Sequence, residues 1–223
     1  MERGITERGI TERGITKRGI IVLAVMGGLL AGCGGGPAES YVDVQAMARL
    51  REALNKDPQL PDGFSARSEE PWRVPFAAAD HNCRAALDPA AGRAPALALT
   101  AQAAASFEGD ELGEVAGVGL ARYAGSEAEG RIEELTEALE ACRAVRAGGG
   151  TRLRLTMLPV EDVGDEVVGA ELRGRLNGYP YALDVMLARS GDTLVSVVHT
   201  GIAKVDPERT RQVLSAAVGM VSA

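Results

Sequence analysis

The chain has 223 residues, a formal net charge of −7 and an aromatic content of only 4%. An acidic protein is poorly suited to nucleic acid, because that binding depends on cationic contacts to phosphate. The length suits one domain of ordinary size with its own hydrophobic core. Because aromatic residues are scarce, we expect Val, Leu and Ala to make up most of that core.

The N-terminal segment is organised like an export signal. Residues 20–32 form a run of thirteen uncharged residues behind Lys17 and Arg18. A helix needs about 20 apolar residues to cross a bilayer, so this run is too short for a permanent membrane span. It matches the basic region, apolar region and small-residue cleavage site of a secretory signal peptide. We therefore predict that residues 1–32 are a signal peptide.

The signal ends in Leu-Ala-Gly-Cys at 30–33, which resembles the lipobox of bacterial lipoproteins. The resemblance implies that the Cys33 thiol carries a diacylglyceryl group, whose two acyl chains give stable anchoring. The alternative is an ordinary signal peptide with a chance cysteine. Lipidation would place the protein on the extracytoplasmic face of the cell membrane. Residues 33–40 would then be a Gly-rich flexible tether and residues 41–223 the folded domain.

The mature chain is more acidic than the whole chain. Removal of residues 1–32 leaves 19 basic and 28 acidic side chains, a net charge of −9. Such a chain gains little from electrostatic attraction to anionic lipid, so we expect the lipid anchor itself to be the contact with the membrane.

The remaining two cysteines form an even pair. In an exported, oxidising setting disulfides persist, so we predict a bond between Cys83 and Cys142. Closing a loop of this length is worth on the order of 4 kcal/mol in the chain-entropy model. Two buried free thiols are the alternative. Metal binding is less favoured, because only His81 lies at ligand spacing from either cysteine, and we expect neither a metal nor a cofactor.

The first third of the mature chain, before residue 96, predicts two helices. The first runs from about Ser40 or Asp43 to Asn55 and is ended by Lys56-Asp57-Pro58. Its apolar stripe consists of Val44, Met47, Leu50 and Leu54. The second, at 77–87, carries Cys83.

Two strands and a long helix follow. Residues 97–108 and 115–123 read as strands joined across Gly109-Asp110. Ser126 and Glu129 predict a capping box at the start of a helix that three glycines at 148–150 end. The apolar face of this helix contains Ile132, Leu135, Leu139 and Cys142. The opposite face contains Glu133, Glu134, Glu137 and Glu140, and a solvated surface explains these carboxylates better than a metal site.

The C-terminal part predicts an antiparallel meander. Residues 152–158 and 167–176 alternate between apolar and polar side chains, as half-buried strands do. Asn177-Gly178 is a strong hairpin signal leading into residues 179–189, and a second tight turn leads into 193–200. Asp206-Pro207 begins a closing helix that ends near Val221. The whole pattern predicts an α+β fold: one domain with an antiparallel sheet of about five to six strands flanked by helices.

Few residues have the types needed for catalysis. The sequence has no Gly-x-Ser-x-Gly elbow, phosphate-cradling Gly loop or His-Glu-x-x-His motif. His199 shares a strand face with Val195 and Val197. This favours a histidine at the edge of the core, with its ring nitrogens hydrogen-bonded, over a role as a ligand or in proton transfer. Asp184 is either buried and paired, for example with an Arg of a neighbouring strand, or lies in a wet cleft. We expect no catalytic residues.

The chain contains several short motifs in the same order as in a known protein family. They are Leu-Pro-Asp-Gly-Phe at 60–64, Cys83, Glu-Ala-Cys at 140–142, Gly-Asp-Glu at 164–166 and Gly-Asp-Thr-Leu-Val at 191–195. In this arrangement the chain resembles the small lipoproteins that carry a PknH-like extracellular sensor domain. The resemblance implies an antiparallel sheet flanked by helices around a cleft that binds or senses a ligand. The chain has no kinase domain and one candidate disulfide where the kinase-attached members usually have two, so no binding residue is carried over.

Three functions remain in view. The first is a non-enzymatic, membrane-anchored lipoprotein that binds an extracellular ligand or a cell-envelope component. The second is an accessory lipoprotein that docks onto a membrane protein complex, which a flat exposed apolar patch would favour. The third is a hydrolase, which a Ser or Asp within hydrogen-bonding reach of His199 would revive.

Overall fold

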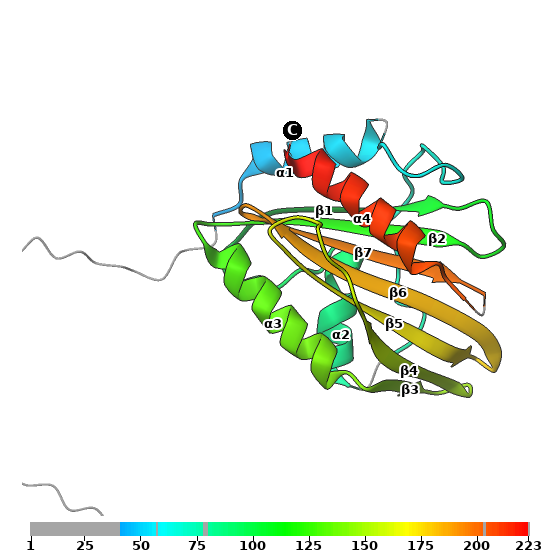
Figure 1. Ribbon diagram of the computed structural model, residues 1–223. Coiled ribbons are helices and arrows are strands. Elements are labelled where there is room, and N and C mark those ends of the chain that lie inside the picture. The colour runs from blue at the N-terminus through cyan, green and yellow to red at the C-terminus, as the bar shows by residue number, and fades with distance from the viewer. Residues whose placement is uncertain (1–40, 57, 78–79, 203, 223) are drawn as a thin grey trace, which may run out of the picture. The chain divides into compact units, whose positions relative to one another are not determined.

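A computed structural model describes residues 41–56, 58–77, 80–202 and 204–222 (Figure 1). All of them lie in one compact unit that clusters within residues 36–223. The signal peptide, Cys33 and the tether lie outside the described residues. Within the described part, no helix combines the length and the apolar character needed to cross a membrane.

The centre of the fold is a sheet of seven strands in the order β1-β2-β7-β6-β5-β4-β3. Every neighbouring pair of strands is antiparallel. The strands are β1 (Leu99–Glu108), β2 (Val115–Tyr123), β3 (Ala144–Ala147), β4 (Thr151–Leu158), β5 (Glu166–Leu176), β6 (Tyr179–Ser190) and β7 (Thr193–Gly201). The predicted meander is confirmed, and Asn177 and Gly178 form its first turn with φ of 50° and 88°.

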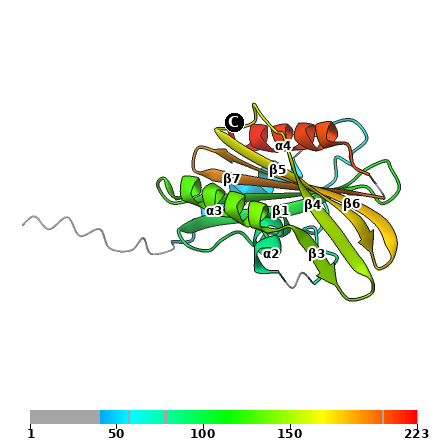
Figure 2. The same ribbon diagram turned by 60° about the horizontal axis from the view of Figure 1, so that its bottom comes forward.

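Helices cover both faces of the sheet (Figures 1 and 2). On one face α1 (Val44–Asn55) packs against β1, and α4 (Pro207–Ser222) packs against β6 and β7. On the other face lie α2 (His81–Leu87), a short 3₁₀ helix (Pro89–Ala91) and α3 (Glu127–Ala141). The described residues therefore form three layers, helix–sheet–helix, which confirms the α+β prediction.

Each face of the sheet has its own core. On the α1/α4 side, Leu50 and Leu54 of α1 and Val213 and Leu214 of α4 are buried against the sheet. The Ala-rich strand β1 belongs to this core, because alternate residues of a strand share a face and its small side chains let α1 approach. On the α2/α3 side, the core contains Leu87, Leu135, Leu139, Leu153, Leu172 and Leu183.

The sheet has one strand more than the five to six predicted. α3 ends at Ala141, and the chain turns back at once into the four-residue strand β3. The glycines at 148–150 therefore connect β3 to β4 and do not end the helix as predicted. Gly149 and Gly150 have φ of 67° and 78°, a conformation that glycine adopts without strain.

Three further local predictions were wrong. The Ser126 side chain makes no capping hydrogen bond, and only its carbonyl accepts from the Glu129 amide. Val44 is 67% exposed because the buried stripe of α1 runs through Ala46, Leu50 and Leu54 at four-residue spacing. The second helix begins at His81 and not at 77, because the Asp80 carboxylate caps it by accepting from the amides of Asn82 and Cys83.

Candidate functional site

Polar side chains lie in a row across the sheet beneath the first turn of α4. Asp184 of β6 pairs in register with His199 of β7 on one side and with Glu171 of β5 on the other. Residues directly opposite each other on neighbouring strands point to the same face. Asp184 is 0% exposed and His199 is 2% exposed, so both polar side chains are buried within an otherwise apolar sheet. A buried polar row of this kind needs partners from outside the sheet.

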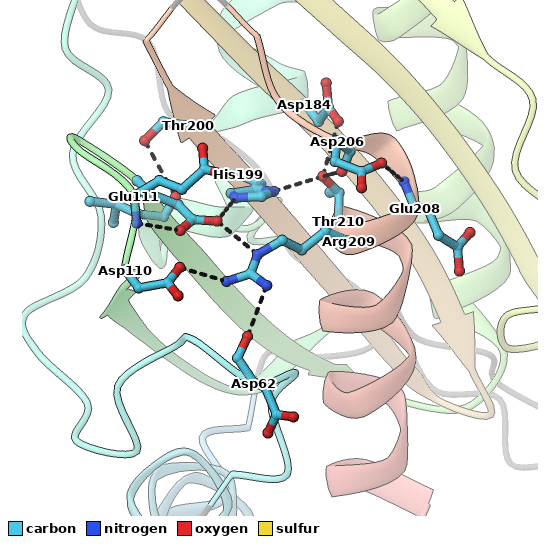
Figure 3. Close-up of polar contacts among 12 residues, drawn as sticks. Asp62, Asp110, Glu111, Asp184, His199, Thr200, Asp206, Glu208, Arg209 and Thr210 are labelled. Atoms are coloured by element: carbon cyan, nitrogen blue, oxygen red, sulfur yellow. Dashed lines mark hydrogen bonds and ion pairs between the residues drawn. The ribbon is translucent and has the colours of Figure 1, made fainter.

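The partners come from α4 and from the turn before β2 (Figure 3). His199 Nδ1 lies 2.9 Å from Thr210 Oγ1, and His199 Nε2 lies 2.9 Å from Glu114 Oε1. Thr210 Oγ1 is also 2.9 Å from Asp184 Oδ2 and 3.1 Å from the Asp206 carbonyl oxygen. We call Asp184, Thr210, His199, Glu114 and Arg209 the buried polar network.

Arg209 closes the network at its solvent side. Its Nε donates to Glu114 Oε1 at 2.8 Å, its Nη1 donates to the Asp62 carbonyl at 2.8 Å, and its Nη2 lies 3.3 Å from Asp110 Oδ1. The guanidinium also stacks over the Phe64 ring at 4.5 Å. Through Arg209, the turn at 60–64 and the β1–β2 turn are both tied to the start of α4.

Burial and hydrogen bonding together shift the pKa values of the network. It raises the pKa of Asp184 to about 6, against a lowering by the hydrogen bond with Thr210. Burial lowers the pKa of His199 more than the neighbouring Glu114 raises it. Burial also raises the pKa of Glu114, but hydrogen bonds from the Glu111 amide, His199 and Arg209 outweigh it and leave that pKa below its usual value. The ring of His199 therefore tends to be neutral and Glu114 ionised.

Two arrangements of the same protons satisfy these contacts. In one, ionised Asp184 accepts from Thr210, which accepts from Nδ1–H of a protonated His199. In the other, protonated Asp184 donates to Thr210, which donates to Nδ1 of a neutral His199. In both, Nε2–H donates to Glu114. Because the pKa of Asp184 is raised to about 6 and the pKa of His199 is lowered, the second arrangement, in which Asp184 holds the proton, is favoured below about pH 6.

The contacts of Thr210, His199 and Glu114 have the order of a nucleophile, a base and an orienting carboxylate. The hydrolase hypothesis called for a Ser or Asp beside His199, and here a threonine hydroxyl takes that place. However, Thr210 is 0% exposed, and its hydroxyl already faces Asp184 and the Asp206 carbonyl. A substrate carbonyl would reach Thr210 Oγ1 only if α4 left the sheet. The arrangement is therefore a structural clamp that holds α4 in place.

A surface groove of about 670 Å³ lies between α2 and α3. Cys83 of α2 and Cys142 at the end of α3 are joined by a disulfide with a Cα–Cα distance of 4.9 Å, which holds the two walls together. The polar and charged lining residues are His81, Asn82, Arg84, Asp88, Arg93, Glu134 and Glu137. Between them lies an apolar strip of Ala85, Pro95, Leu135, Ala138 and Ala141. The groove therefore presents both charges beside an apolar floor.

The acidic face of α3 is solvated, as predicted. Glu133, Glu137 and Glu140 are exposed, and Glu134 pairs with Arg131 at 2.7 Å. Among the residues that the structure describes, no group of three His, Cys, Asp or Glu side chains is placed to hold a metal ion.

No family model matches the chain, and no curated protein matches it at a significant level. Among solved structures, the extracellular domain of PknH from Mycobacterium tuberculosis matches with a TM-score of 0.53, covering 85% of this chain and 99% of that domain. The two share a fold. At 12% sequence identity, the similarity to the PknH domain shows the fold alone. An uncharacterized Rv0999 ortholog from Mycobacterium smegmatis, with 20% identity over 82% of this chain and 98% of that one, has a TM-score of 0.42 and adds no argument.

The sequence pointed to part of the network within this PknH-like fold. A satisfied core position for His199 is confirmed, and Asp184 is buried and hydrogen-bonded. Its partner is the Thr210 hydroxyl and not an Arg of a neighbouring strand, because Arg173 pairs with Glu171 instead. Thr210 was missed, although it is a polar residue in line with the apolar stripe of Val213, Leu214 and Ala217. Glu114 and Arg209 carry no local signal.

Proposed function

We propose that the protein is a non-enzymatic lipoprotein, anchored through Cys33 on the extracytoplasmic face of the membrane, whose domain binds a ligand or an envelope component. The Leu-Ala-Gly-Cys sequence at 30–33 supports the anchor. The Cys83–Cys142 disulfide supports an exported location, because such bonds persist in oxidising compartments. The burial of Thr210 and His199 argues against hydrolysis at that position.

The observation that carries the binding function is the groove between α2 and α3. Its volume of about 670 Å³ is within the range of small-molecule sites. Arg84 lines it, and the Arg84 side chain makes no hydrogen bond or ion pair within the described residues, whereas Arg93 is held by Asp88 at 2.6 Å. A ligand with an anionic group and an apolar body would fit this wall. Binding there would report to the sheet through α3, whose Leu135 faces both the groove and the core.

Cell fractionation of a Cys33→Ala variant tests the anchor. We expect the wild-type protein in the membrane fraction and the variant in the soluble extracytoplasmic fraction, because loss of the thiol removes the site of acylation. Ser40→Ala, in the same tether, is the matched control and should stay with the membrane. If wild type and Cys33→Ala distribute identically, the lipoprotein assignment is wrong.

An accessory, docking function is the second candidate, and one surface favours it. Tyr41, Val42 and Val44 are 78%, 58% and 67% exposed where the described chain begins. The Asp43 amide donates to the Thr100 carbonyl, which places this group beside the start of β1 near Leu97, itself 60% exposed. Exposed apolar side chains that gather in this way are typical of a contact with another protein or a membrane. The two candidates share the anchor and differ in the surface that is occupied.

A further inference from the structure

Five arginines lie on one face of the outer strands β3, β4 and β5. Arg146, Arg152 and Arg175 are cross-strand neighbours in one row, and Arg154 and Arg173 are neighbours in the next. The side chains that alternate with them, including Val145, Leu153 and Leu172, are buried in the core on the α2/α3 side. The arginines therefore project from the opposite surface of the sheet. We call Arg146, Arg152, Arg154, Arg173 and Arg175 the arginine face.

This surface is open to solvent. On the same side of the sheet, α4 packs against β6 and β7 and α1 packs against β1, and Figures 1 and 2 show β3, β4 and β5 extending beyond both helices. All five arginines are exposed. The neighbours on this face closer to α4 are Ala182 and Pro180, which offer no charge.

The arginine face is poorly neutralised by the protein itself. The side chains of Arg146, Arg152 and Arg154 make no hydrogen bond or ion pair within the described part of the chain. Arg173 pairs with Glu171, and Arg175 donates to the Gly178 carbonyl at 2.6 Å. Like charges directly opposite each other on neighbouring strands are destabilising. An anionic partner would relieve this repulsion, which is otherwise screened only by solvent and salt.

The spacing of the cluster indicates the form of that partner. Neighbouring strands are about 4.8 Å apart, and alternate residues along a strand are about 6.7 Å apart. The backbone positions of the arginine face thus form a grid at intervals of about 5 to 7 Å, and each position carries one cation. Each guanidinium presents a planar fork of donors that matches a phosphate or carboxylate group. We propose that the arginine face binds an extended polyanion whose phosphate groups recur at short intervals, such as a phosphate-bearing envelope polymer.

Two observations favour such a polymer over an acidic protein or the anchoring membrane. Hot spots of protein interfaces are Trp, Tyr and Arg side chains in well-packed, desolvated pockets. The five arginines are exposed instead, and they share their two rows only with the small or cyclic residues Ala144, Ala182 and Pro180. The first described residue, Tyr41, lies beside the start of β1, at the end of the sheet that also holds the start of β5. Arg175 is at the other end of β5. The cluster therefore lies toward the opposite end of the sheet from the first described residue, and its use as an argument against the membrane rests on the proposed anchor at Cys33.

Binding of inorganic polyphosphate to the detergent-extracted full-length protein tests the proposal. The informative variant is Arg146→Gln/Arg152→Gln/Arg154→Gln, which removes the three unpaired cations. Its matched control is Arg49→Gln/Arg51→Gln/Arg67→Gln, which removes three exposed arginines elsewhere and changes the net charge equally. We expect the wild type and the control to bind within twofold of each other and the face variant at least tenfold more weakly. Polyphosphate should also raise the Tm of the wild type but not that of the face variant.

Five results would overturn the proposal. Four of them are no binding of polyphosphate to the wild type, an unchanged affinity of the face variant, an equal loss in the control, and an equal or tighter affinity for polyglutamate. Displacement of polyphosphate by mixed micelles that contain phosphatidylglycerol would assign the surface to lipid headgroups and would also overturn it. None of these results depends on lipidation, which the Cys33→Ala fractionation measures separately.

Discussion

Asp184 is the residue whose environment departs most from that of an ordinary surface carboxylate. It has no exposed surface, its Oδ1 has no hydrogen-bond partner among the described residues, and its Oδ2 faces the Thr210 hydroxyl. Thr210 has one hydrogen to share between Asp184 and His199. When Asp184 holds its own proton, each contact in the row has a donor. When Asp184 loses that proton and His199 is neutral, one contact is left without a donor, so deprotonation should weaken the clamp on α4.

The raised pKa of Asp184 therefore predicts a specific pH dependence. A carboxyl group with a folded pKa of about 6 and a usual pKa of 3.8 stabilises the fold at low pH, and this contribution is lost as the pH rises from about 4 through 6. The full loss is about 3 kcal/mol. In Asp184→Asn the amide keeps a donor for Thr210 at every pH. We expect the unfolding free energy of wild type minus that of Asp184→Asn, measured in urea, to fall by up to that amount between pH 4 and pH 7.

The matched control is Asp62→Asn, whose exposed side chain points away from the network (Figure 3). Its difference from the wild type should not change over this range by more than a few tenths of a kcal/mol, as is typical of surface substitutions. If the difference for Asp184→Asn is flat or grows with pH, Asp184 is ionised in the fold throughout and the proposed proton arrangement is wrong.

At the scale of elements, α2 depends on its surroundings more than the other helices do. It has seven residues, and helices this short are marginal in water without tertiary support. That support comes from the Asp80 cap, from buried Ala86 and Leu87, and from the disulfide to the end of α3. The same bond closes a loop with a sequence separation of 59 residues.

Removing the disulfide should therefore lower stability and loosen α2 in particular. For Cys83→Ala/Cys142→Ala we expect a loss of about 4 kcal/mol in unfolding free energy. Hydrogen exchange should speed up in α2 more than in α4, because α4 is held by its own core and by the polar network. The wild type under reducing conditions is the matched comparison and should behave like the double variant. Equal protection of α2 in all three samples would contradict this role.

Much of the architecture was readable because its signals are local. Asn177-Gly178 fixes one hairpin, and the alternation in residues 167–176 places Arg173 and Arg175 on the outer face. Strand β3 could not be read, because its four residues are too few to show a period of two. The arginine face was also hidden: alternation shows which way Arg152 and Arg175 point, but only the register of β4 against β5 brings them side by side.

The buried polar network was hidden for a related reason. Glu114 is 85 residues from His199 and 95 residues from Arg209 in the sequence. It lies in a turn, where a glutamate gives no indication that it is buried. A single sequence carries no signal for contacts at such separations. The burial of His199 was predictable from its strand face, whereas its partners follow only from the packing of α4 across β6 and β7.

At the scale of the whole molecule, the described domain carries three candidate contact surfaces in different positions. The exposed apolar group at Tyr41–Val44 lies where the described chain begins, the groove lies between α2 and α3, and the arginine face lies on the outer strands on the α4 side. A binding domain held by its N-terminal end would keep the second and third surfaces available to ligands. The proposed function requires that the protein is anchored through Cys33 and that it lies in the oxidising compartment that this anchor implies.

The intact mass of the membrane-extracted protein, measured with and without reduction, tests both at once. The account predicts the mass of residues 33–223 plus a diacylglyceryl group, with a gain of two hydrogens on reduction of the Cys83–Cys142 bond. An unmodified mass that still includes residues 1–32 and does not change on reduction would contradict it. The protein would then be neither exported nor anchored, and the proposed function would fall.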